Sequence, residues 1–596
     1  MTENRLCHYA LILTVGTLLF LPNLGAFALW EEDEAHNAQC AQEMADADTW
    51  VVPTFNFKLR PDKPILQYWA IRFSYLLFGA NEWSARLPSA LVSLISLLLC
   101  YELGRSLFDP LTGLVSALLL ASSIMFNVAA HAVTPDAFLV ATVLAGLTAF
   151  AIGYRRGSST WLVTSSVASA LAMLAKGPVG VILPLGIVGC FLLWQRQLRL
   201  LFTPRLFLGA ALFVLVAVPW YVRVGIETRF EFIRGFFFKH NLERFQSGME
   251  GHGAGWWFHP LVLFVTFAPG SIFLLLAIWS AWGGESSVPV HTAGNWRRRL
   301  RAMIVPVQRE DWAYRLLACW IAVWMTFFSI AATKLPNYLL PMFPALAVLV
   351  ARFLVRWMRG EVRLPIWVTN TLFACFAVMG IVIGVGLLVG AGALPGIGTR
   401  AIPALLPCAV IGLVPVAFGW LAFRWERKGR RTRVLAGILG ASCLTIAVLA
   451  GAIPGELESG RAIKALAQRL AAEPIEGDRL IGCHRAYHPS LVYYTNRLVW
   501  RSLSDDRAVD LLNSPWPAFL IVSEKNWPRL STRVRSECSI LARAPEFKAG
   551  DHLLLVYNHG QCSIDELRPA WVSSRLGSSP HPSVMNVQPS PTADSR

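Results

Sequence analysis

A cluster of acidic residues begins the first long polar stretch of the sequence. Glu31, Glu32, Asp33 and Glu34 follow directly on an apolar segment, and His36 comes two positions later. A carboxylate held at a fixed place can accept a proton from an attacking group or orient that group. Acids also stabilise the first turn of a helix through its dipole, so solvated charges at a helix start are the competing interpretation.

A second group of residues that could take part in a reaction lies further along the same stretch, in the sequence Arg60-Pro61-Asp62-Lys63-Pro64. Proline restricts the backbone on both sides, which suits a carboxylate and an ammonium held at set positions. An ordinary surface turn is the alternative interpretation. We select Asp62 and Lys63 as candidate site residues.

Three more polar stretches carry charged, imidazole or phenolic side chains. They supply Asp136 in Thr134-Pro135-Asp136, His240 and Arg244 in the stretch 239–245, and Lys334 and Tyr338 in the stretch 333–338. Cations can hold a phosphate, and a carboxylate can activate an incoming nucleophile. If these stretches meet in space, the set fits a reaction on an anionic substrate.

The elements that must position these residues are membrane helices. Of the 596 residues, 55% are hydrophobic and 15% are charged, whereas soluble domains have roughly 25% charged residues. This composition excludes a soluble enzyme, and we predict about 13 transmembrane helices. The segments are about 9–29, 87–104, 111–127, 134–153, 160–176, 178–195, 206–223, 260–282, 315–332, 338–354, 367–391, 404–423 and 433–453. We interpret the first as an uncleaved anchor.

The formal charge of +16 is a signal of membrane topology. Lys and Arg collect in cytoplasmic loops, and the richly basic connections, such as 297–309 and 424–433, all fall on one side if the N-terminus is cytoplasmic. The candidate site stretches then fall on the outer side. Because the charge is explained by orientation, we predict no nucleic-acid partner.

The domain organisation follows from the same assignment. We predict a transmembrane domain over 1–453 with long outer loops at 30–86 and 224–259, an outer α/β domain over 454–575, and a disordered tail over 576–596. Within the α/β domain the pattern predicts a helix over 460–472 and β-rich runs over 480–482, 491–494, 518–522 and 553–557. A disulfide could join two of Cys483, Cys538 and Cys562, and the sequence leaves that pairing open.

The order of several short motifs resembles a known family. They are Asp33-Glu34, Glu43-Met44, Trp50-Val51-Val52-Pro53, Asp62-Lys63-Pro64, Tyr68-Trp69, Arg86-Leu87-Pro88, Thr134-Pro135-Asp136, Lys176-Gly177-Pro178, Arg244-Phe245, Trp256-Trp257 and the stretch 334–341. Together they resemble the bacterial aminoarabinose (lipid A) transferase-like family, within the protein O-mannosyltransferase superfamily of GT-C glycosyltransferases. The resemblance covers about residues 25 to 355, and the plan of 13 spans with a periplasmic C-terminal domain is also similar.

The resemblance implies an activity and a location. The family transfers a sugar with inversion from a polyprenyl-phosphate carrier, usually undecaprenyl phosphate, to an acceptor on the periplasmic face of the bacterial inner membrane. We expect a multi-pass enzyme that moves aminoarabinose or a similar pentose or hexose to lipid A or other lipopolysaccharide. A protein O-mannosyltransferase-like enzyme with a protein acceptor, a polytopic lipid or sugar transporter and a non-catalytic assembly factor are the alternatives. A transporter predicts ionisable residues at mid-membrane, and the predicted spans contain almost none.

The resemblance also implies roles for the candidate residues. Asp33 and Asp136 are the expected catalytic residues. The expected contacts to the donor phosphate are Lys63, Arg244, Tyr338, Lys334 and His36. Glu34, Asp62 and His240 are supporting residues or contacts for a divalent metal, whose need the sequence leaves open. The family commonly has Arg at the position of His36 and Glu at that of Asp62, so this chain departs from the pattern at both places.

Overall fold

The computed structural model describes residues 2–30, 33–243, 245, 253–282, 311–393, 402–458, 462–473, 480–545 and 552–559. It divides into two compact units. The helical unit comprises Met1–Lys464, His488–Arg497 and Pro545–Gly550, and the sheet unit comprises Ala465–Tyr487, Leu498–Ala544 and Asp551–Arg596. Each unit is described by itself.

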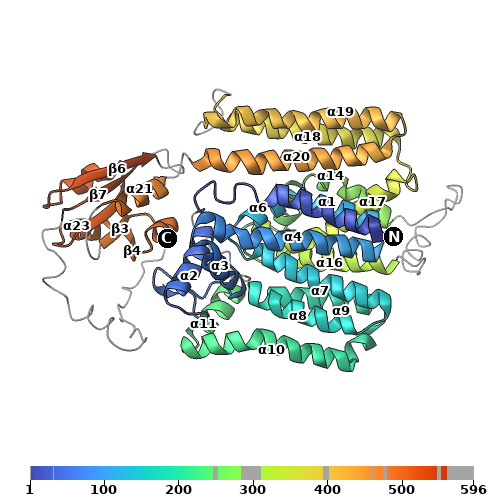
Figure 1. The fold of residues 1–596 in the computed structure, drawn as a ribbon, viewed down its shortest axis with the longest axis horizontal. Coiled ribbons are helices and arrows are strands. Elements are labelled where there is room, and N and C mark those ends of the chain that lie inside the picture. Colours follow the sequence, from blue (N-terminus) through green and yellow to red (C-terminus); the bar gives the residue numbers. More distant parts are fainter. Residues whose placement is uncertain are drawn as a thin grey trace. The chain divides into compact units, whose positions relative to one another are not determined.

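Long helices lie side by side in the helical unit (Figure 1). Its first half contains α1 (Thr2–Phe20), α2 (Asp33–Asp46), a hairpin of β1 (Thr54–Phe55) and β2 (Lys58–Leu59), α3 (Leu66–Phe78), α4 (Glu82–Leu107), α5 (Pro110–Ala121), α6 (Ile124–His131), α7 (Asp136–Arg156), α8 (Thr160–Lys176), α9 (Val179–Trp194) and α10 (Pro204–Glu227). A short 3-10 helix, η1 (Leu198–Phe202), precedes α10.

The second half begins with α11 (Glu231–Arg234) and the π-helix η2 (Gly235–Glu243). It continues with α13 (Phe258–Thr266), α14 (Ser271–Trp282), α16 (Asp311–Ile330), the 3-10 helix η3 (Pro336–Met342), α17 (Phe343–Met358), α18 (Ile366–Gly390), the 3-10 helices η4 (Pro403–Leu405) and η5 (Pro407–Gly412), α19 (Leu413–Arg427), α20 (Arg431–Glu458) and α22 (Pro489–Thr495). Every predicted apolar segment overlaps one of these helices or a pair of them.

Eight of the described helices are long and apolar enough to cross a membrane, and ten spans result if two bent pairs each count as one. The pairs are α5 with α6, bent by 66°, and α13 with α14, bent by 113°. The other predicted segments lie on α1 and α9, which are shorter apolar helices, and on α8, which has 17 residues. The count of 13 spans therefore stays a prediction.

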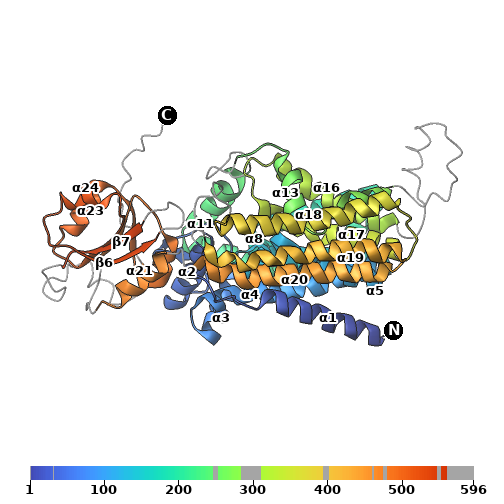
Figure 2. The ribbon, with the colours of Figure 1, turned by 90° about the horizontal axis from the view of Figure 1, so that it is seen from above.

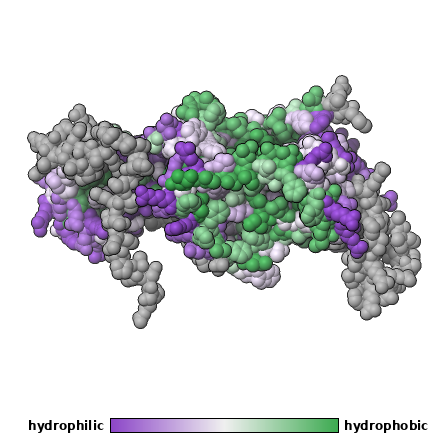
Figure 3. All heavy atoms as spheres, turned by 90° about the horizontal axis from the view of Figure 1, so that it is seen from below, coloured by the Kyte–Doolittle hydropathy of each residue, from purple (hydrophilic) through white to green (hydrophobic). Residues whose placement is uncertain are grey.

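The surface of the helical unit carries many large apolar side chains. Phe207, Leu215 and Ile226 on α10, and Trp367 and Val382 on α18, are each more than half exposed. In Figure 3 such residues gather over the middle of the unit, with hydrophilic residues towards its two ends. An exposed apolar belt of this extent suits contact with lipid.

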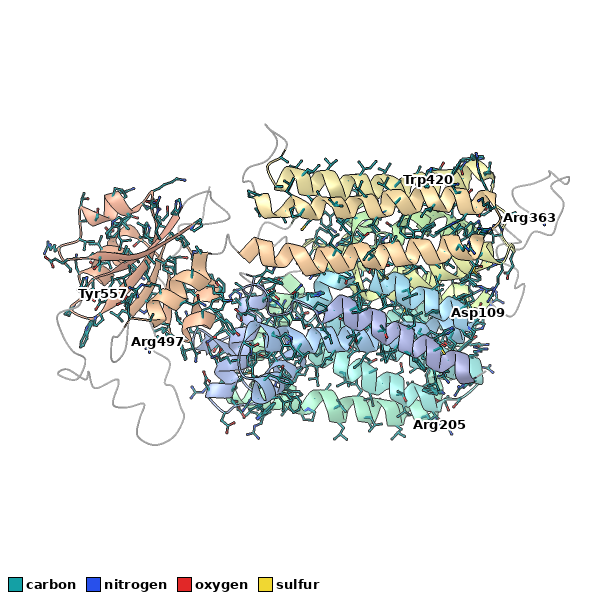
Figure 4. All side chains as sticks on the ribbon, turned by 45° about the horizontal axis from the view of Figure 1, so that its top comes forward. Asp109, Arg205, Arg363, Trp420, Arg497 and Tyr557 are labelled. Carbon is teal, nitrogen blue, oxygen red and sulfur yellow. The ribbon has the colours of Figure 1, made fainter. Side chains whose placement is uncertain are left out.

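Charged residues mark one end of the helical unit. Asp109, Arg205 and Arg363 lie at the end where α1 begins (Figure 4). The Asp109 carboxylate there accepts hydrogen bonds from Arg352 at 3.0 Å and from Arg359 at 3.1 Å. The helices α2 and α3 lie at the opposite end (Figures 1 and 2). The basic connections and the first long loop are thus separated by the length of the helices.

The helix α2 carries Asp33 in its first turn. The i, i+3, i+4 spacing of small and apolar residues such as Ala38 and Ala41 predicts a helix that lies in the membrane interface. The helix is confirmed, but its apolar side packs on protein rather than on lipid. Ala35, Ala38 and Ala41 are fully buried in a cluster with Ile71 of α3. Protein contacts therefore fix the orientation of α2.

A buried ion pair holds the start of α2 against α4. Glu34 Oε2 accepts a hydrogen bond from Arg86 Nη2 at 2.7 Å, and Oε1 accepts one from Arg86 Nε at 2.9 Å. Backbone N–H groups fill the remaining positions of the carboxylate, and Arg86 donates to backbone carbonyls. The N–H groups belong to Trp30 and Val133, and the carbonyls to Leu24, Phe27 and Ala28. Burial alone would raise the pKa of Glu34, but Arg86 and the N–H groups outweigh it and lower that pKa.

The short helix α22 packs on α2 within the helical unit. The Tyr494 hydroxyl accepts a hydrogen bond from the Leu29 N–H at 3.0 Å and donates one to Glu82 at 3.1 Å. The predicted β-rich run over 491–494 is wrong. Pro489 suits the first turn of a helix, and Leu491 is fully buried, so helix formation is favoured locally and by packing.

The sheet unit contains a five-stranded mixed sheet with the strand order β4-β3-β5-β7-β6. β3 is parallel to β4 and β5, and β5 is antiparallel to β7. The elements are β3 (Leu480–His484), β4 (Val499–Leu503), α23 (Asp505–Leu512), β5 (Ala518–Ser523), α24 (Trp527–Ser531), β6 (Ser539–Pro545), β7 (His552–Tyr557) and most of α21 (Ala462–Ala471). The other three predicted β-rich runs and the predicted helix are confirmed.

Two of the three cysteines considered for a disulfide lie in the described part of the sheet unit. Cys483 is buried and Cys538 is partly buried, and the two are not joined to each other. Burial raises the pKa of Cys538. Cys562 and the predicted tail over 576–596 lie outside the described residues.

The buried ion pair generates a prediction about stability. We expect Glu34→Gln to lower the free energy of unfolding by about 3 kcal/mol, because it leaves the Arg86 charge buried without its partner. Thermal unfolding of the purified protein in detergent measures this loss. Glu227→Gln is the matched control, because the Arg223 side chain that it pairs with is 70% exposed and such pairs contribute about 0–1 kcal/mol. Equal melting temperatures for the two variants would contradict the assignment.

Candidate active site

Asp136 is buried at the start of α7 and has two partners from distant parts of the chain. Its carboxylate forms an ion pair with Lys176 at the end of α8. It also accepts a hydrogen bond from the Asn337 side-chain amide at 2.9 Å. The Lys176 ammonium lies 5.4 Å from the centre of the Tyr338 ring. Asp136 and Tyr338, two of the predicted site residues, therefore both lie beside Lys176.

Glycine and proline residues shape the turns that place these side chains. α8 ends at Gly177, which has a φ of +82°. A side chain at Gly177 would have its Cβ only 2.4 Å from the ring of Phe236 in η2. The Lys176-Gly177-Pro178 turn therefore needs glycine both for its backbone conformation and for the close approach of η2.

Asp62 lies in a second cluster of charges in the first loop. One carboxylate oxygen is 3.0 Å from His240 Nε2, and the other is 3.2 Å from Arg60 Nε. Burial alone would raise the pKa of Asp62, but the hydrogen bond from His240 and the charges of Arg60 and Lys63 lower it well below its usual range. Asp62 is therefore a carboxylate across the physiological pH range.

The π-helix η2 packs on the first loop beside Asp62. A Cβ at Gly235 would lie 2.6 Å from the Pro61 ring, so these two residues are in close contact. His240 extends from the same π-helix to Asp62. Asp62 and His240 thus contact each other in the structure, while their role as metal contacts stays a prediction. Among the described residues there is no group of three or more His, Cys, Asp and Glu side chains arranged to hold a metal ion.

Lys63 connects the two clusters electrostatically. Its charge acts on Asp62 and also on Asp136. The two carboxylates come from stretches more than seventy positions apart in the sequence, yet they share this cation. The predicted convergence of the outer stretches is seen for Asp62, Asp136 and Tyr338, because η2 contacts both Pro61, beside Asp62, and Gly177, beside Lys176.

Asp33 and His36 lie on α2. The Asp33 side chain is exposed, which leaves it accessible to a substrate. The His36 ring packs against the Phe55 ring of the hairpin, with 4.4 Å between the ring centres. The structure thus shows an accessible carboxylate, and its catalytic role stays a prediction.

Two other predicted site residues are engaged by the fold, and a third lies outside the described residues. The four hydrogen bonds to Glu34 occupy the accepting positions of a carboxylate, which favours a structural role over the predicted metal contact. The Lys334 ammonium donates to the carbonyl oxygens of Phe328 and Ser329 at 2.9 and 2.6 Å, at the end of α16. Arg244 is not among the described residues.

Comparisons with known proteins show which proteins this chain is similar to. The sequence pattern of the family described as "Dolichyl-phosphate-mannose-protein mannosyltransferase" matches residues 62–222. The "Undecaprenyl phosphate-alpha-4-amino-4-deoxy-L-arabinose arabinosyl transferase" of Pseudomonas aeruginosa (strain UCBPP-PA14) is 30% identical over 60% of this chain and 61% of its own length. An uncharacterised protein of Aquifex aeolicus is 31% identical over 58% of this chain and 73% of its own length. The chain belongs to the aminoarabinose transferase-like family.

The fold of this family member is also that of a solved structure. The crystal structure of ArnT from Cupriavidus metallidurans bound to undecaprenyl phosphate superposes with a TM-score of 0.73 at 22% identity, over 92% of this chain and 97% of that one. The chain is therefore a multi-pass membrane protein with the GT-C fold and a small α/β C-terminal region. It spans about three fifths of the length of the curated transferases that it matches.

Sequence reasoning missed three residues that the structure places in the site of this aminoarabinose transferase-like protein. Lys176 and Asn337 contact Asp136, and Arg60 contacts Asp62. Lys176 was the only cation in its short outer connection and part of a family motif, which was the available signal. Asn337 and Arg60 lie next to selected residues but carry no pattern of their own.

The Asp136–Lys176 pair generates a prediction that separates folding from chemistry. We expect Asp136→Asn and Lys176→Met each to destabilise the protein by about 3 kcal/mol, because each leaves one buried charge without its partner. The double variant should lose less than the sum of the two, because both charges are then gone. Thermal unfolding of the four proteins measures this coupling. Additive losses would show that the pair does not stabilise the fold.

Proposed function

We propose that the protein is an inverting glycosyltransferase. It transfers aminoarabinose or a similar sugar from a polyprenyl phosphate, usually undecaprenyl phosphate, to lipid A or other lipopolysaccharide. The observation that carries this proposal is that η2 contacts both the loop with Asp62 and Lys63 and the turn after Lys176, which pairs with Asp136. The names of the curated relatives, which specify undecaprenyl phosphate and aminoarabinose, support the choice of donor.

The proposed reaction is a single displacement. An oxygen of the acceptor attacks the anomeric carbon of the sugar, and the bond from that carbon to the carrier phosphate oxygen breaks. The electron pair of the broken bond stays on the phosphate, which leaves as an anion. If the attacking oxygen carries a proton, Asp33 accepts it. If the acceptor is a lipid A phosphate, it is already anionic, and Asp33 orients it.

The charges of the site suit this leaving group. A phosphate leaves without protonation, so cations that stabilise the developing charge replace a general acid. We assign Lys63 and Tyr338 to the carrier phosphate, with Lys334, Arg244 and His36 as further expected contacts. Asp136 is assigned to binding a sugar of the donor or the acceptor. Asp62, His240 and Glu34 keep supporting roles, with Asp62 and His240 as the candidate contacts for a divalent metal.

A protein hydroxyl is a second candidate acceptor. The description of the matching family names a protein mannosyltransferase, which is the reason to test a protein acceptor beside a lipid acceptor. The same donor chemistry and the same base would serve a serine or threonine hydroxyl. An acceptor assay with both lipid A and membrane proteins distinguishes them.

We further propose that the N-terminus is cytoplasmic and that the active site and the C-terminal α/β region are periplasmic, at the bacterial inner membrane. The grouping of Asp109, Arg205 and Arg363 at the end where α1 begins (Figure 4) supports this orientation, because basic connections are cytoplasmic. Membrane lipid then surrounds the exposed apolar side chains of the helical unit.

The first prediction from this function concerns the proposed base. Asp33→Asn should abolish transfer of labelled aminoarabinose from undecaprenyl phosphate to lipid A in proteoliposomes, because it removes the charge but keeps the size of the side chain. Mass spectrometry of the lipid product measures transfer. Glu231→Gln is the control, because Glu231 is an exposed acid of α11. Near-normal transfer by folded Asp33→Asn protein would exclude Asp33 as the base.

The second prediction concerns orientation. Green fluorescent protein fused to the N-terminus should fluoresce, because it folds in the cytoplasm. Alkaline phosphatase fused after Tyr557 should be active, because it folds in the periplasm. The reverse pattern would show that the basic connections do not mark the cytoplasmic side.

A further inference from the structure

Arg60 is a buried cation with few partners. The residue is 8% exposed and follows the β1–β2 hairpin. A guanidinium carries five N–H donors. In the described part of the chain its partners are the Asp62 carboxylate, 3.2 Å from Nε, and the Phe55 ring, whose centre is 5.8 Å away. Even Nε lacks a well-directed hydrogen bond, although it is closed off from solvent.

The side chain is nevertheless charged, because a guanidinium is not deprotonated in proteins. Asp62 is the carboxylate in contact with it, 3.2 Å from Nε.

A buried charge without enough hydrogen bonds is costly. Arg86 in the same unit shows how the protein satisfies a structural arginine, with two bonds to Glu34 and three to backbone carbonyls. Arg60 has no such shell among the described residues. Its planar fork of N–H groups matches the oxygens of a phosphate, which the proposed reaction brings to this site.

We propose that Arg60 binds a phosphate group of a lipid substrate beside Lys63. The guanidinium keeps Asp62 on its Nε side and presents its two terminal nitrogens to the phosphate. The inference rests on the proposed function. The phosphate can belong to the polyprenyl carrier or to lipid A, and the binding experiment distinguishes the two.

The positive charge of Arg60 can be supplied from position 36 instead. The His36 ring packs on the Phe55 ring, at 4.4 Å between centres, and the Arg60 guanidinium lies over the same ring. The two side chains therefore reach the same place from α2 and from the end of the hairpin. An arginine at position 36 can substitute for one at position 60.

The experiment compares each phosphorylated lipid with its phosphate-free form, using the purified full-length protein. The first pair is undecaprenyl phosphate and undecaprenol, and the second is lipid A and dephosphorylated lipid A. Arg60→Met should reduce the preference for the phosphorylated member of one pair by about tenfold or more, since hydrogen bonds to charged groups are worth this much. Binding of the phosphate-free member should persist, which a merely structural role does not predict. The affected pair identifies the phosphate.

Two further variants and one control complete the test. Arg60→Lys, and His36→Arg combined with Arg60→Met, should recover part of the preference, because each restores a cation beside Phe55. Lys58→Met removes an exposed charge from the same hairpin and should leave both preferences unchanged. A loss in Arg60→Met that neither variant relieves would overturn the proposal.

The outcomes also separate this inference from the proposed function. If the wild-type protein prefers undecaprenyl phosphate over undecaprenol and Arg60→Met keeps both preferences, the role of Arg60 is excluded and the function stands. If the wild-type protein shows no preference for either phosphorylated lipid, the proposed function itself fails.

Discussion

The ion pair between Glu34 and Arg86 is the interaction on which the rest of the site depends. Asp33 is exposed, and its neighbour Glu34 is buried. The hydrogen bonds of the Glu34 carboxylate therefore set the position of Asp33. Arg86 in turn gathers carbonyl oxygens from the chain before α2. The hydrogen bonds of this pair offset the cost of removing its two charges from water. The pair also joins the first loop to the long apolar helix α4.

The site itself is a set of charges from separate loops, each held differently. Asp136 is fixed by Lys176 and Asn337 in buried surroundings. Asp62 is fixed by a histidine from a π-helix that packs tightly on the first loop. Lys63 acts on both carboxylates. With Arg60 beside Asp62, three basic side chains, Lys63, Lys176 and Arg60, lie with these two carboxylates, which suits an anionic substrate.

Much of the fold could be predicted from the sequence, because apolar segments of membrane length are a strong local signal. The convergence of Asp62 and Asp136 could be predicted from topology and family resemblance together. The partner of Glu34 could not, because Arg86 lies 52 positions away and nothing local links them. Residues 491–494 were misassigned for a related reason: four β-prone residues carry little information, and burial against α2 decides their conformation. The hydrogen bond from the Lys334 ammonium to a backbone carbonyl also depends on tertiary structure, so the sequence does not indicate it.

The contact between α22 and the first loop has a consequence for biosynthesis. Tyr494 accepts a hydrogen bond from the Leu29 N–H, 465 positions earlier in the chain, and Asn496 binds Asp46 at the far end of α2. Chains are made from the N-terminus onward, so the ribosome has produced every predicted span before this contact can form. The segment that bears Asp33 therefore acquires its final support late, and a nascent chain that has only its membrane helices still lacks a completed active-site loop.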